Sequence, residues 1–253
     1  MITPIHCDFL KSNKLLLDEI GMRFTFIRND DSFCLNGIDK TKIDINSIEV
    51  HARKCEIAEE IKIAHRNSLK ISPIKYPIKS TKLFVFTIDD KSYGNTQKFQ
   101  LGDIIPNKVI LGLVKDEAFN GSLKENPFNF EDHDLKNVSL RVNSKLHDIQ
   151  VNRFENDFID GYHSICEVLN LYGRNKSPIH KKEYNKGNYL FGFNLNPDKG
   201  CPGQFQYLKR GNIELNLSFK NVTDKKLKAV VMCEYDNQIS INRDSEIEFA
   251  LKI

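Results

Sequence analysis

A histidine and a cysteine three residues apart form the closest approach to a catalytic pair in this sequence. His163 and Cys166 are of the right types, because an imidazole can activate a nearby thiol as a nucleophile. Both fall on one amphipathic helical pattern, and no neighbouring residue is recognisable as the group that would orient such a base. Helix packing is the commoner meaning of this spacing. We therefore predict no catalytic residue and a protein that is not an enzyme.

Metal chemistry finds little support in the spacing of possible ligands. The seven histidines include no H-x-H or H-E-x-x-H pair, so no local motif brings two imidazoles to one ion. The run Glu131, Asp132, His133 and Asp134 could hold a divalent ion, but an oxygen cage needs ligands from more than one such turn. The sequence has no Walker loop, G-x-G-x-x-G loop or G-x-S-x-G elbow. We predict no metal, no cofactor and no small-molecule substrate.

Positive charge is the third candidate for chemistry. The formal net charge of +3 is small for a nucleic-acid-binding protein, which concentrates Lys and Arg on one face. The densest basic cluster has no interleaved aromatic platform for base stacking. It comprises Arg174, Lys176, His180, Lys181 and Lys182. A solvated loop is the expected structure. The alternative is a contact patch that faces a genome or another subunit, with at most weak nucleic-acid binding.

Most of the elements that must position these residues are predicted strands. Alternating apolar and polar residues, which give a strand one buried and one solvated face, recur along the chain. Five segments show this period: residues 22–26, 83–88, 189–195, 213–220 and 229–235. Residues 109–114 are instead an unbroken apolar run, which predicts a strand buried on both faces. We expect turns at residues 118–121 and 236–237.

Two helices are predicted among the strands. Residues 56–69 carry apolar positions at a spacing of three and four, ending before Pro73. Residues 154–171 form one stripe of aromatic and aliphatic side chains, in which Gly173 is a stop signal and Gly161 weakens the middle. The predicted fold is therefore mainly β, a jelly-roll β-sandwich with one or two short helices.

The loop at residues 126–130 is predicted to be fixed by its own side chains. Its sequence, NPFNF, combines a proline that restricts the backbone with two aromatic rings. Rings left exposed there would form an apolar patch. We therefore predict that Pro127, Phe128 and Phe130 are structural anchors of this loop against the sandwich.

The composition is that of a globular β-rich protein. Of the 253 residues, 40% are apolar, which suffices for a sizeable core. No apolar run approaches the about 20 residues of a membrane span. The N-terminus lacks the charged start and apolar centre of a signal peptide, so we expect synthesis inside a host cell and no secretion. Six cysteines without C-x-x-C pairs are expected to be reduced and mostly buried.

Several short motifs, in order along nearly the whole chain, resemble one protein family. They are LLL at 15–17 with DDSFCL at 30–35, KYPI at 75–78, IIPNKVILGLVKDEAFNGSLKENPFNF at 104–130, KGNYLFGFNLNPD at 186–198, GNIEL at 211–215, and EYDN at 234–237 with INRD at 241–244. This set is similar to the hexon-like major capsid proteins of Polinton (Maverick) elements and of the related adintoviruses. It also resembles uncharacterised animal proteins that look like genomic copies of those elements.

The resemblance implies a domain organisation. Family members look longer at the N-terminus, so the chain resembles the C-terminal part of a double jelly roll. Residues 1–80 would hold the remainder of the first roll and a helical connector, and residues 81–253 would form the C-terminal roll. Residues 22–27 and 45–57 are then expected to be first-roll strands, and KYPI is expected to form a turn before a strand.

The resemblance also implies a function. It suggests a structural capsid subunit that forms homotrimeric capsomers and contacts neighbouring capsid proteins in the virion. The alternative is a capsid-derived, domesticated β-sandwich that serves as a binding module without catalytic activity. The segment CPGQF at residues 201–205 departs from the acidic turn expected there, so the contacts of that loop stay open.

Overall fold

The chain folds into two compact units. The structure, a computed structural model, describes residues 2–11, 14–18, 20–37, 41–90, 96–151, 158–171, 178–196, 209–244 and 246–251. One unit, called the sandwich unit below, consists of Asn29–Lys42 and Thr81–Tyr235. The other, called the terminal unit, consists of Met1–Arg28, Ile43–Ser80 and Asp236–Ile253.

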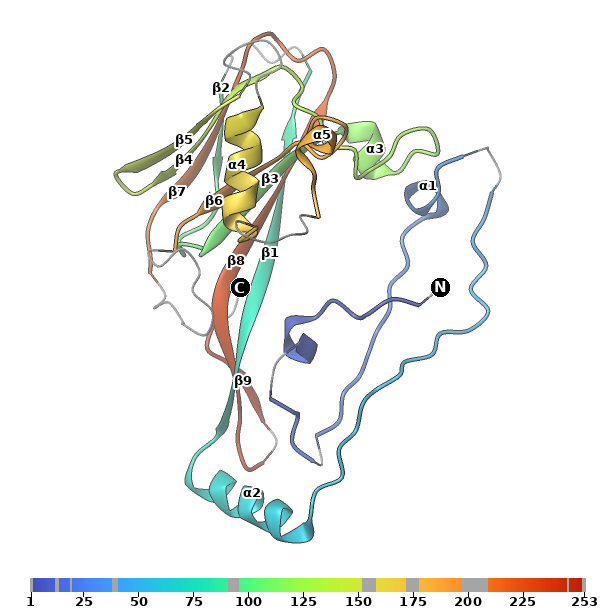
Figure 1. The fold of residues 1–253 in the computed structure, drawn as a ribbon, viewed down its shortest axis with the longest axis vertical. Helices are drawn as coiled ribbons and strands as arrows, with labels where there is room; N and C mark the ends of the chain where they lie inside the picture. Colours follow the sequence, from blue (N-terminus) through green and yellow to red (C-terminus); the bar gives the residue numbers. More distant parts are fainter. Residues whose placement is uncertain are drawn as a thin grey trace. The chain divides into compact units, whose positions relative to one another are not determined.

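Strands make up most of the regular structure in the described residues (Figure 1). The strands are β1 (Ile74–Ile88), β2 (Thr96–Gln100), β3 (Lys108–Lys115), β4 (Leu135–Val142), β5 (Lys145–Gln150), β6 (Leu190–Asn194), β7 (Ile213–Phe219), β8 (Leu227–Ile241) and β9 (Ile247–Phe249). The helices are a short 3-10 helix at Asp8–Lys11, then α1 (Asp31–Cys34), α2 (Glu59–Ile71), α3 (Asp116–Asn120), α4 (Ile159–Val168) and α5 (Lys181–Tyr184). Only α2 and α4 among them exceed five residues, and both correspond to predicted helices.

The strands form two antiparallel sheets with the order of a jelly roll. One sheet runs β1-β8-β3-β6, with β9 paired to β8, and the other runs β2-β7-β4-β5. From β1 to β8, each strand lies in the opposite sheet from the strand before it. The exception is β5, which pairs with β4 in a hairpin. Two four-stranded sheets interleaved in this way are an eight-stranded jelly roll. The predicted mainly β, jelly-roll fold class is confirmed.

The core of the sandwich unit lies between the two sheets. In β7, residues at alternate positions are buried, as the period-two pattern predicted. In β3, every residue from 111 to 114 is buried. Leu111 pairs with Val231 of β8 on one side and with Phe191 of β6 on the other, so β3 is a central strand, as predicted. Burial of such side chains contributes about 1.5–3 kcal/mol each.

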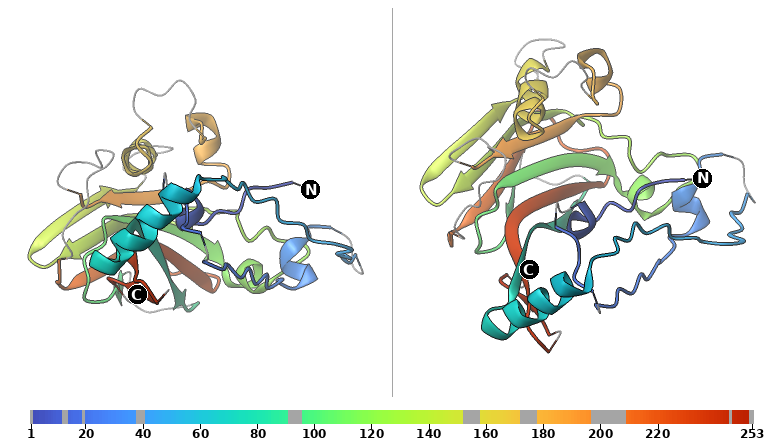
Figure 2. Two further views of the ribbon diagram at one scale, coloured as in Figure 1. Left: turned by 90° about the horizontal axis from the view of Figure 1, so that it is seen from below. Right: turned by 60° about the horizontal axis from the view of Figure 1, so that its bottom comes forward.

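Helix α4 packs closely against β6 (Figure 2). It begins at Ile159, and residues 154–157 of the predicted helix lie outside the described residues. Gly161 is the third residue of α4, and a Cβ there would come within 2.6 Å of the Tyr184 hydroxyl. Gly192 on β6 is equally crowded, since its Cβ would lie 2.6 Å from Val168 Cγ2. Two glycines thus permit the close approach of helix and strand.

The terminal unit has a small apolar cluster of its own. Tyr76 is fully buried and packs with Ile239 and Ile241. The Phe9 ring contacts the Tyr76 ring edge-on, with 5.5 Å between the ring centroids. The Tyr76 hydroxyl donates to the Leu15 carbonyl oxygen at 3.2 Å and accepts from the Leu17 N–H at the same distance. Burial raises the pKa of Tyr76, so the hydroxyl keeps its proton. Two motifs far apart in the sequence, LLL and KYPI, therefore meet here.

Two predicted strands are absent from the described residues. Residues 22–27 and 45–57 have no strand structure, although their sequences alternate as a strand would. Their apolar side chains are largely exposed, including Phe26 at 53% and Ile48 at 57%. A strand needs a hydrogen-bonded neighbour, and neither segment has one among the described residues. The prediction of a half-buried strand at residues 22–26 is therefore wrong for this chain alone, whereas the assignment of both segments to a first roll stays a prediction.

Two predicted turns lie inside strands. The KYPI motif is part of β1, where Pro77 is tolerated because β1 is an edge strand and its missing N–H costs no ladder bond. Residues 236–237 are part of β8, which continues to Ile241. Asn237 is buried there, and its side chain donates to the Leu251 carbonyl and accepts from the Leu251 N–H, both at 2.9 Å. Asn237 therefore serves to hydrogen-bond the backbone of Leu251 inside the protein, and it does not form the predicted turn.

The cysteines differ from the prediction that most are buried. Cys166 and Cys233 are buried, whereas Cys7, Cys34 and Cys55 are exposed, and all five are free thiols. The three exposed ones lie in the N-terminal 55 residues, which have no sheet to cover them. Cys201 lies outside the described residues. No helix in the described part of the chain is long and apolar enough to cross a membrane.

Candidate functional site

The three predicted anchors in the loop at residues 126–130 differ in how far they are buried. Pro127 is buried, and Phe130 is half-buried against Gly112 of β3, where a Cβ would come within 2.5 Å of the Phe130 ring. The Phe130 backbone also pairs with the next strand region, because its N–H donates to the Gly187 oxygen at 3.0 Å. Phe128 is 65% exposed, since the Asn126 side chain accepts from its N–H and turns the residue outward. The anchoring role stays a prediction, with Phe130 the better placed ring.

The segment Asn29–Lys42 of the sandwich unit, called the strap below, contacts this loop region through its described residues 29–37. The ring of Phe33, from α1, contacts the Phe128 ring edge-on, with 5.9 Å between the ring centroids. The Gly37 N–H donates to the Leu123 oxygen at 2.9 Å. Gly121 has a φ of +103°. A Cβ at this position would lie only 2.7 Å from the Ser32 Oγ, so the absence of a side chain leaves room for Ser32. Sequence reasoning missed this contact, because nothing local links residues about ninety positions apart in the chain.

An ion pair fastens the same loop to the end of β3. The Lys115 Nζ lies 2.8 Å from Glu125 Oε1, and both side chains are about three-quarters covered. The hydrogen bond to Glu125 raises the pKa of Lys115, and the same bond lowers the pKa of Glu125. Both groups are therefore charged at neutral pH, and the pair resists titration.

The acidic turn after the loop does not assemble a metal site. The Asn129 amide donates to Glu131 Oε1 at 2.8 Å, which uses one of the candidate oxygens. His133 and Asp134 both have positive φ, 47° and 59°, so the backbone here is a tight turn. No group of three His, Cys, Asp or Glu side chains in the described residues could hold a metal ion.

His133 is the unusual residue of this turn. Its Nε2 is buried and finds no hydrogen-bond partner among the described residues. Burial lowers the pKa of His133, while the neighbouring carboxylates of Glu131 and Asp132 oppose the shift. The imidazole therefore stays neutral near pH 7 and costs free energy to protonate.

The His163 and Cys166 pair does not form a reactive centre in the structure. Cys166 is buried in α4, whereas His163 is exposed. His163 lines an open groove of about 550 Å³ with His147, Asp160 and Glu167, and Cys166 is not among the residues that line it. A buried thiol outside the groove has no access to a substrate held there.

The predicted basic cluster is only partly described. Lys181 and Lys182 are exposed on α5, and His180 precedes them as an exposed cap residue. The other two members, Arg174 and Lys176, lie outside the described residues, as does the loop at 201–205. A contact role for this patch stays a prediction.

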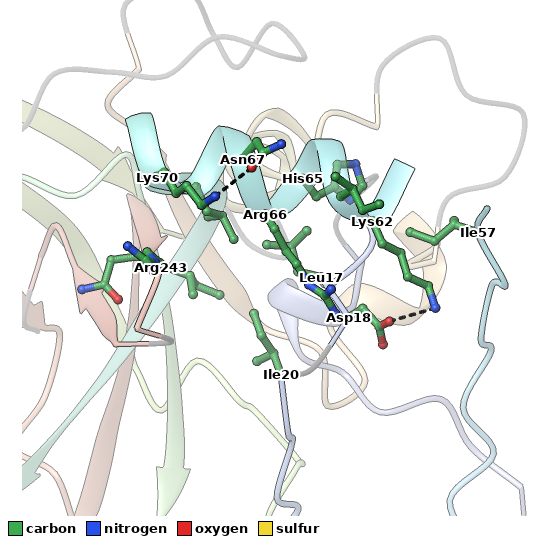
Figure 3. Close-up of a pocket in the computed structure, with 14 residues that line it drawn as sticks. Leu17, Asp18, Ile20, Ile57, Lys62, His65, Arg66, Asn67, Lys70 and Arg243 are labelled. Atoms are coloured by element: carbon green, nitrogen blue, oxygen red, sulfur yellow. Dashed lines mark hydrogen bonds and ion pairs between the residues drawn. The ribbon is translucent and has the colours of Figure 1, made fainter. Parts of the chain in front are cut away.

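A different basic site, which the sequence did not predict, lies in the terminal unit. A cavity of about 470 Å³ is bounded by one face of α2, by residues 17–20 and by the end of β8 (Figure 3). Lys62, Arg66 and Lys70 line it from α2, and Arg243 lines it from the turn after β8. The spacing of four residues on α2 puts three cations on one helix face. That spacing was visible in the sequence, but the approach of Arg243 was not.

Comparisons with known proteins give one sequence relative and several solved structures. No family model matches the chain. It is 24% identical over 254 aligned positions to the uncharacterized protein F54H12.2 of Caenorhabditis elegans, an alignment that covers 94% of this chain. The chain spans only 60% of that nematode protein's length.

Solved structures of viral proteins align with the chain. A chain of the Sputnik virophage structure covers 72% of this chain at 14% identity, with a TM-score of 0.47 and 39% of its own length. The mavirus major capsid protein covers 71% at 10% identity, with a TM-score of 0.39 and 42% of its length. A chain of the PBCV-1 virus capsid covers 72% at 9% identity, with a TM-score of 0.41 and 52% of its length. At these scores, the jelly-roll assignment rests on the strand order of this chain alone.

Proposed function

We propose that this chain is a structural capsid subunit of a Polinton-like virus or element, or a cellular copy of such a subunit. The observation that carries the proposal is the complete eight-stranded order, β1-β8-β3-β6 facing β2-β7-β4-β5. A jelly roll closes its two sheets on each other and frees its loops and edges for contacts between subunits. The motifs that resemble hexon-like capsid proteins support the same function.

The chemistry of the described residues agrees with a structural role. The pair His163 and Cys166 is divided between solvent and core, and no described cluster offers a metal site. We infer a protein whose work is assembly and not catalysis.

The proposed assembly is a homotrimer that packs beside other capsid proteins in the virion shell. Residues 81–253 would form the C-terminal roll, and residues 1–80 would contribute to a first roll and its connector. Shells of this kind gain stability from many weak contacts repeated by symmetry. The exposed Phe128, the α5 lysines and the apolar side chains of residues 22–50 are the surfaces best suited to such contacts.

Size-exclusion chromatography with light scattering on the full chain tests the proposal. We expect a concentration-dependent species of three times the 29.2 kDa chain mass, and larger particles by electron microscopy at high concentration. A monomer at every concentration would contradict self-assembly. Measured turnover of an ester, peptide or nucleic-acid substrate that tracks the purified protein would contradict the absence of catalysis.

A second function, a domesticated binding module, is favoured by one observation. The relative in Caenorhabditis elegans aligns with 94% of this chain, so a protein of this kind occurs in an animal. A module freed from shell assembly would remain monomeric. It would also show a melting temperature that rises with a ligand, because a ligand that binds only the folded state stabilises it.

A further inference from the structure

The cavity in the terminal unit combines strong positive charge with an apolar wall. Four cationic side chains line it, Lys62, Arg66, Lys70 and Arg243, whereas Asp18 is the one carboxylate among the described lining residues. The apolar part comes from side chains of three segments, namely Leu17, Ile20, Leu69 and Ile241. Lys62 is half-buried, whereas Arg66, Lys70 and Arg243 are exposed, so these three side chains can reach a ligand from solvent.

The positions of the cations suit a ligand with several anionic groups. In Figure 3, Lys62 and Arg66 extend from α2 toward Leu17 and Asp18, and Lys70 and Arg243 lie together at the other end. Four residues along a helix correspond to about 6 Å, so the three helical cations repeat at about that distance. A single anionic group meets one or two of them, whereas a chain of linked phosphates meets all three.

The chemistry of the lining favours phosphate over a nucleobase. Lys and Arg donate charge-assisted hydrogen bonds to phosphate oxygens, and Arg does so with two N–H groups at once. None of the described lining residues is Phe, Tyr or Trp, and His65 offers the one ring on which a base could stack, so the lining is poor in the aromatic rings that single-stranded nucleic acid uses. A volume of about 470 Å³ is also that of a small-ligand pocket.

We propose that this cavity is a binding site for a compact oligophosphate, a ligand that carries two or more linked phosphate groups. Arg66, Lys70 and Arg243 bind the phosphate oxygens. Asp18, whose carboxylate lies 3.5 Å from the Lys62 Nζ, competes with the ligand for that ammonium group. Glu59 competes in the same way at 3.6 Å. The site is independent of the capsid function proposed above, and neither result decides the other.

Isothermal titration of the full chain with inorganic tripolyphosphate tests the site. We expect one saturable site per chain, with orthophosphate binding far more weakly at the same ionic strength. Arg66→Gln and Arg243→Gln should each weaken binding about tenfold, because each removes a charge-assisted contact. Asp18→Asn should tighten binding about threefold, since it removes the competing charge and keeps the shape. General charge attraction would give the same signs, so the evidence for a site is saturation at one ligand per chain and the greater effect of these changes than of equal charge changes elsewhere.

A matched control separates the cavity from general surface charge. Lys181→Gln with Lys182→Gln removes two exposed lysines on α5, in the sandwich unit, and should leave the affinity unchanged. Equal weakening by this control, or no saturable binding by the unaltered chain, would overturn the proposal. If a thymidine oligonucleotide binds more tightly than tripolyphosphate at equal phosphate concentration, the proposal that the ligand is a compact oligophosphate is wrong. Arg243 is exposed on a turn, so its variant tests the site even if a change in α2 disturbs folding.

Discussion

At the scale of single residues, two glycines decide how α4 meets the sheet. Gly192 of β6 faces α4, and a Cβ there would lie 2.6 Å from Val168 Cγ2 and 3.0 Å from the Ser164 carbonyl oxygen. The Ser164 hydroxyl also accepts from the Gly192 N–H at 3.1 Å. A backbone carbonyl cannot move aside as a flexible side chain can. The sequence showed Gly161 as a weak point of a helix, whereas the structure shows it as a packing requirement.

Gly192→Ala should therefore destabilise the fold. The added methyl group must push α4 away from β6, which we expect to lower the free energy of unfolding by about 1–3 kcal/mol. Chemical denaturation followed by circular dichroism measures this change. Gly21→Ala is the matched control, because nothing lies within 4 Å of its Cβ position and its φ is not positive. A loss of the same size in the control would assign the effect to glycine replacement in general.

His133 should make the stability of the protein depend on pH. Burial lowers the pKa of His133 below its ordinary value of 6.5, so the unfolded chain binds the proton more tightly than the folded chain. The contribution of His133 to stability is thus fully present above about pH 6.5 and is lost as the pH falls toward the folded pKa. Glu131, Asp132 and Asp134 oppose the shift, and Lys115 adds to it.

Melting temperatures at about pH 7.5 and about pH 5.5 test this expectation. His133→Asn, which keeps a residue that tolerates positive φ, should lose less stability on acidification than the unaltered chain. Burial lowers the pKa of His147 as well, so part of the acid sensitivity should remain in this variant. His180→Asn changes an exposed histidine and should leave the pH dependence as it was. An equal loss in all three proteins would exclude His133 as the cause.

At the scale of elements, local pattern predicted the strands that have neighbours. The alternation at β7 and the apolar run at β3 each reflect a face that the jelly roll buries. Residues 22–26 carry the same alternation and form no strand, because pairing depends on a partner that the pattern does not name. Pro77 and the buried pair at 236–237 mimic turn signals, yet an edge position and a side-chain clamp accommodate them within strands.

The anchor loop after β3 gives an element-scale test of the two rings. Phe130 covers Gly112 and is half-buried, so Phe130→Ala should cost about 2 kcal/mol of unfolding free energy. Phe128 is 65% exposed with one ring contact to Phe33, so Phe128→Ala should cost less than about 1 kcal/mol. Thermal and urea unfolding of both variants provides the comparison. Equal costs for the two would mean that the strap covers Phe128 more fully than its exposure indicates.

At the scale of the whole molecule, the sequence predicted the fold class better than the sites. A jelly roll follows from many short alternating strands, and each of those is a local signal. The basic cavity is lined both by α2 and by a turn that lies far along the chain. Likewise, α1 in the strap contacts the loop at residues 126–130. Neither contact leaves a local trace, because each depends on how distant segments fold together.

The exposed apolar side chains of residues 22–50 should drive the self-association of the full chain. Phe26 is 53% exposed and Ile48 is 57% exposed, in two segments that alternate like strands without a partner. Segments of this kind pair with other chains. We expect Phe26→Asp with Ile48→Asp to shift the chain toward monomer in light scattering, with little change in melting temperature, because neither side chain contributes to a core. Val222→Asp, a loop residue that is 47% exposed, is the control and should leave the association unchanged. Oligomers that survive the double substitution would place the subunit contacts elsewhere, with Phe128 and the edge strands of the sandwich unit as the next surfaces to alter.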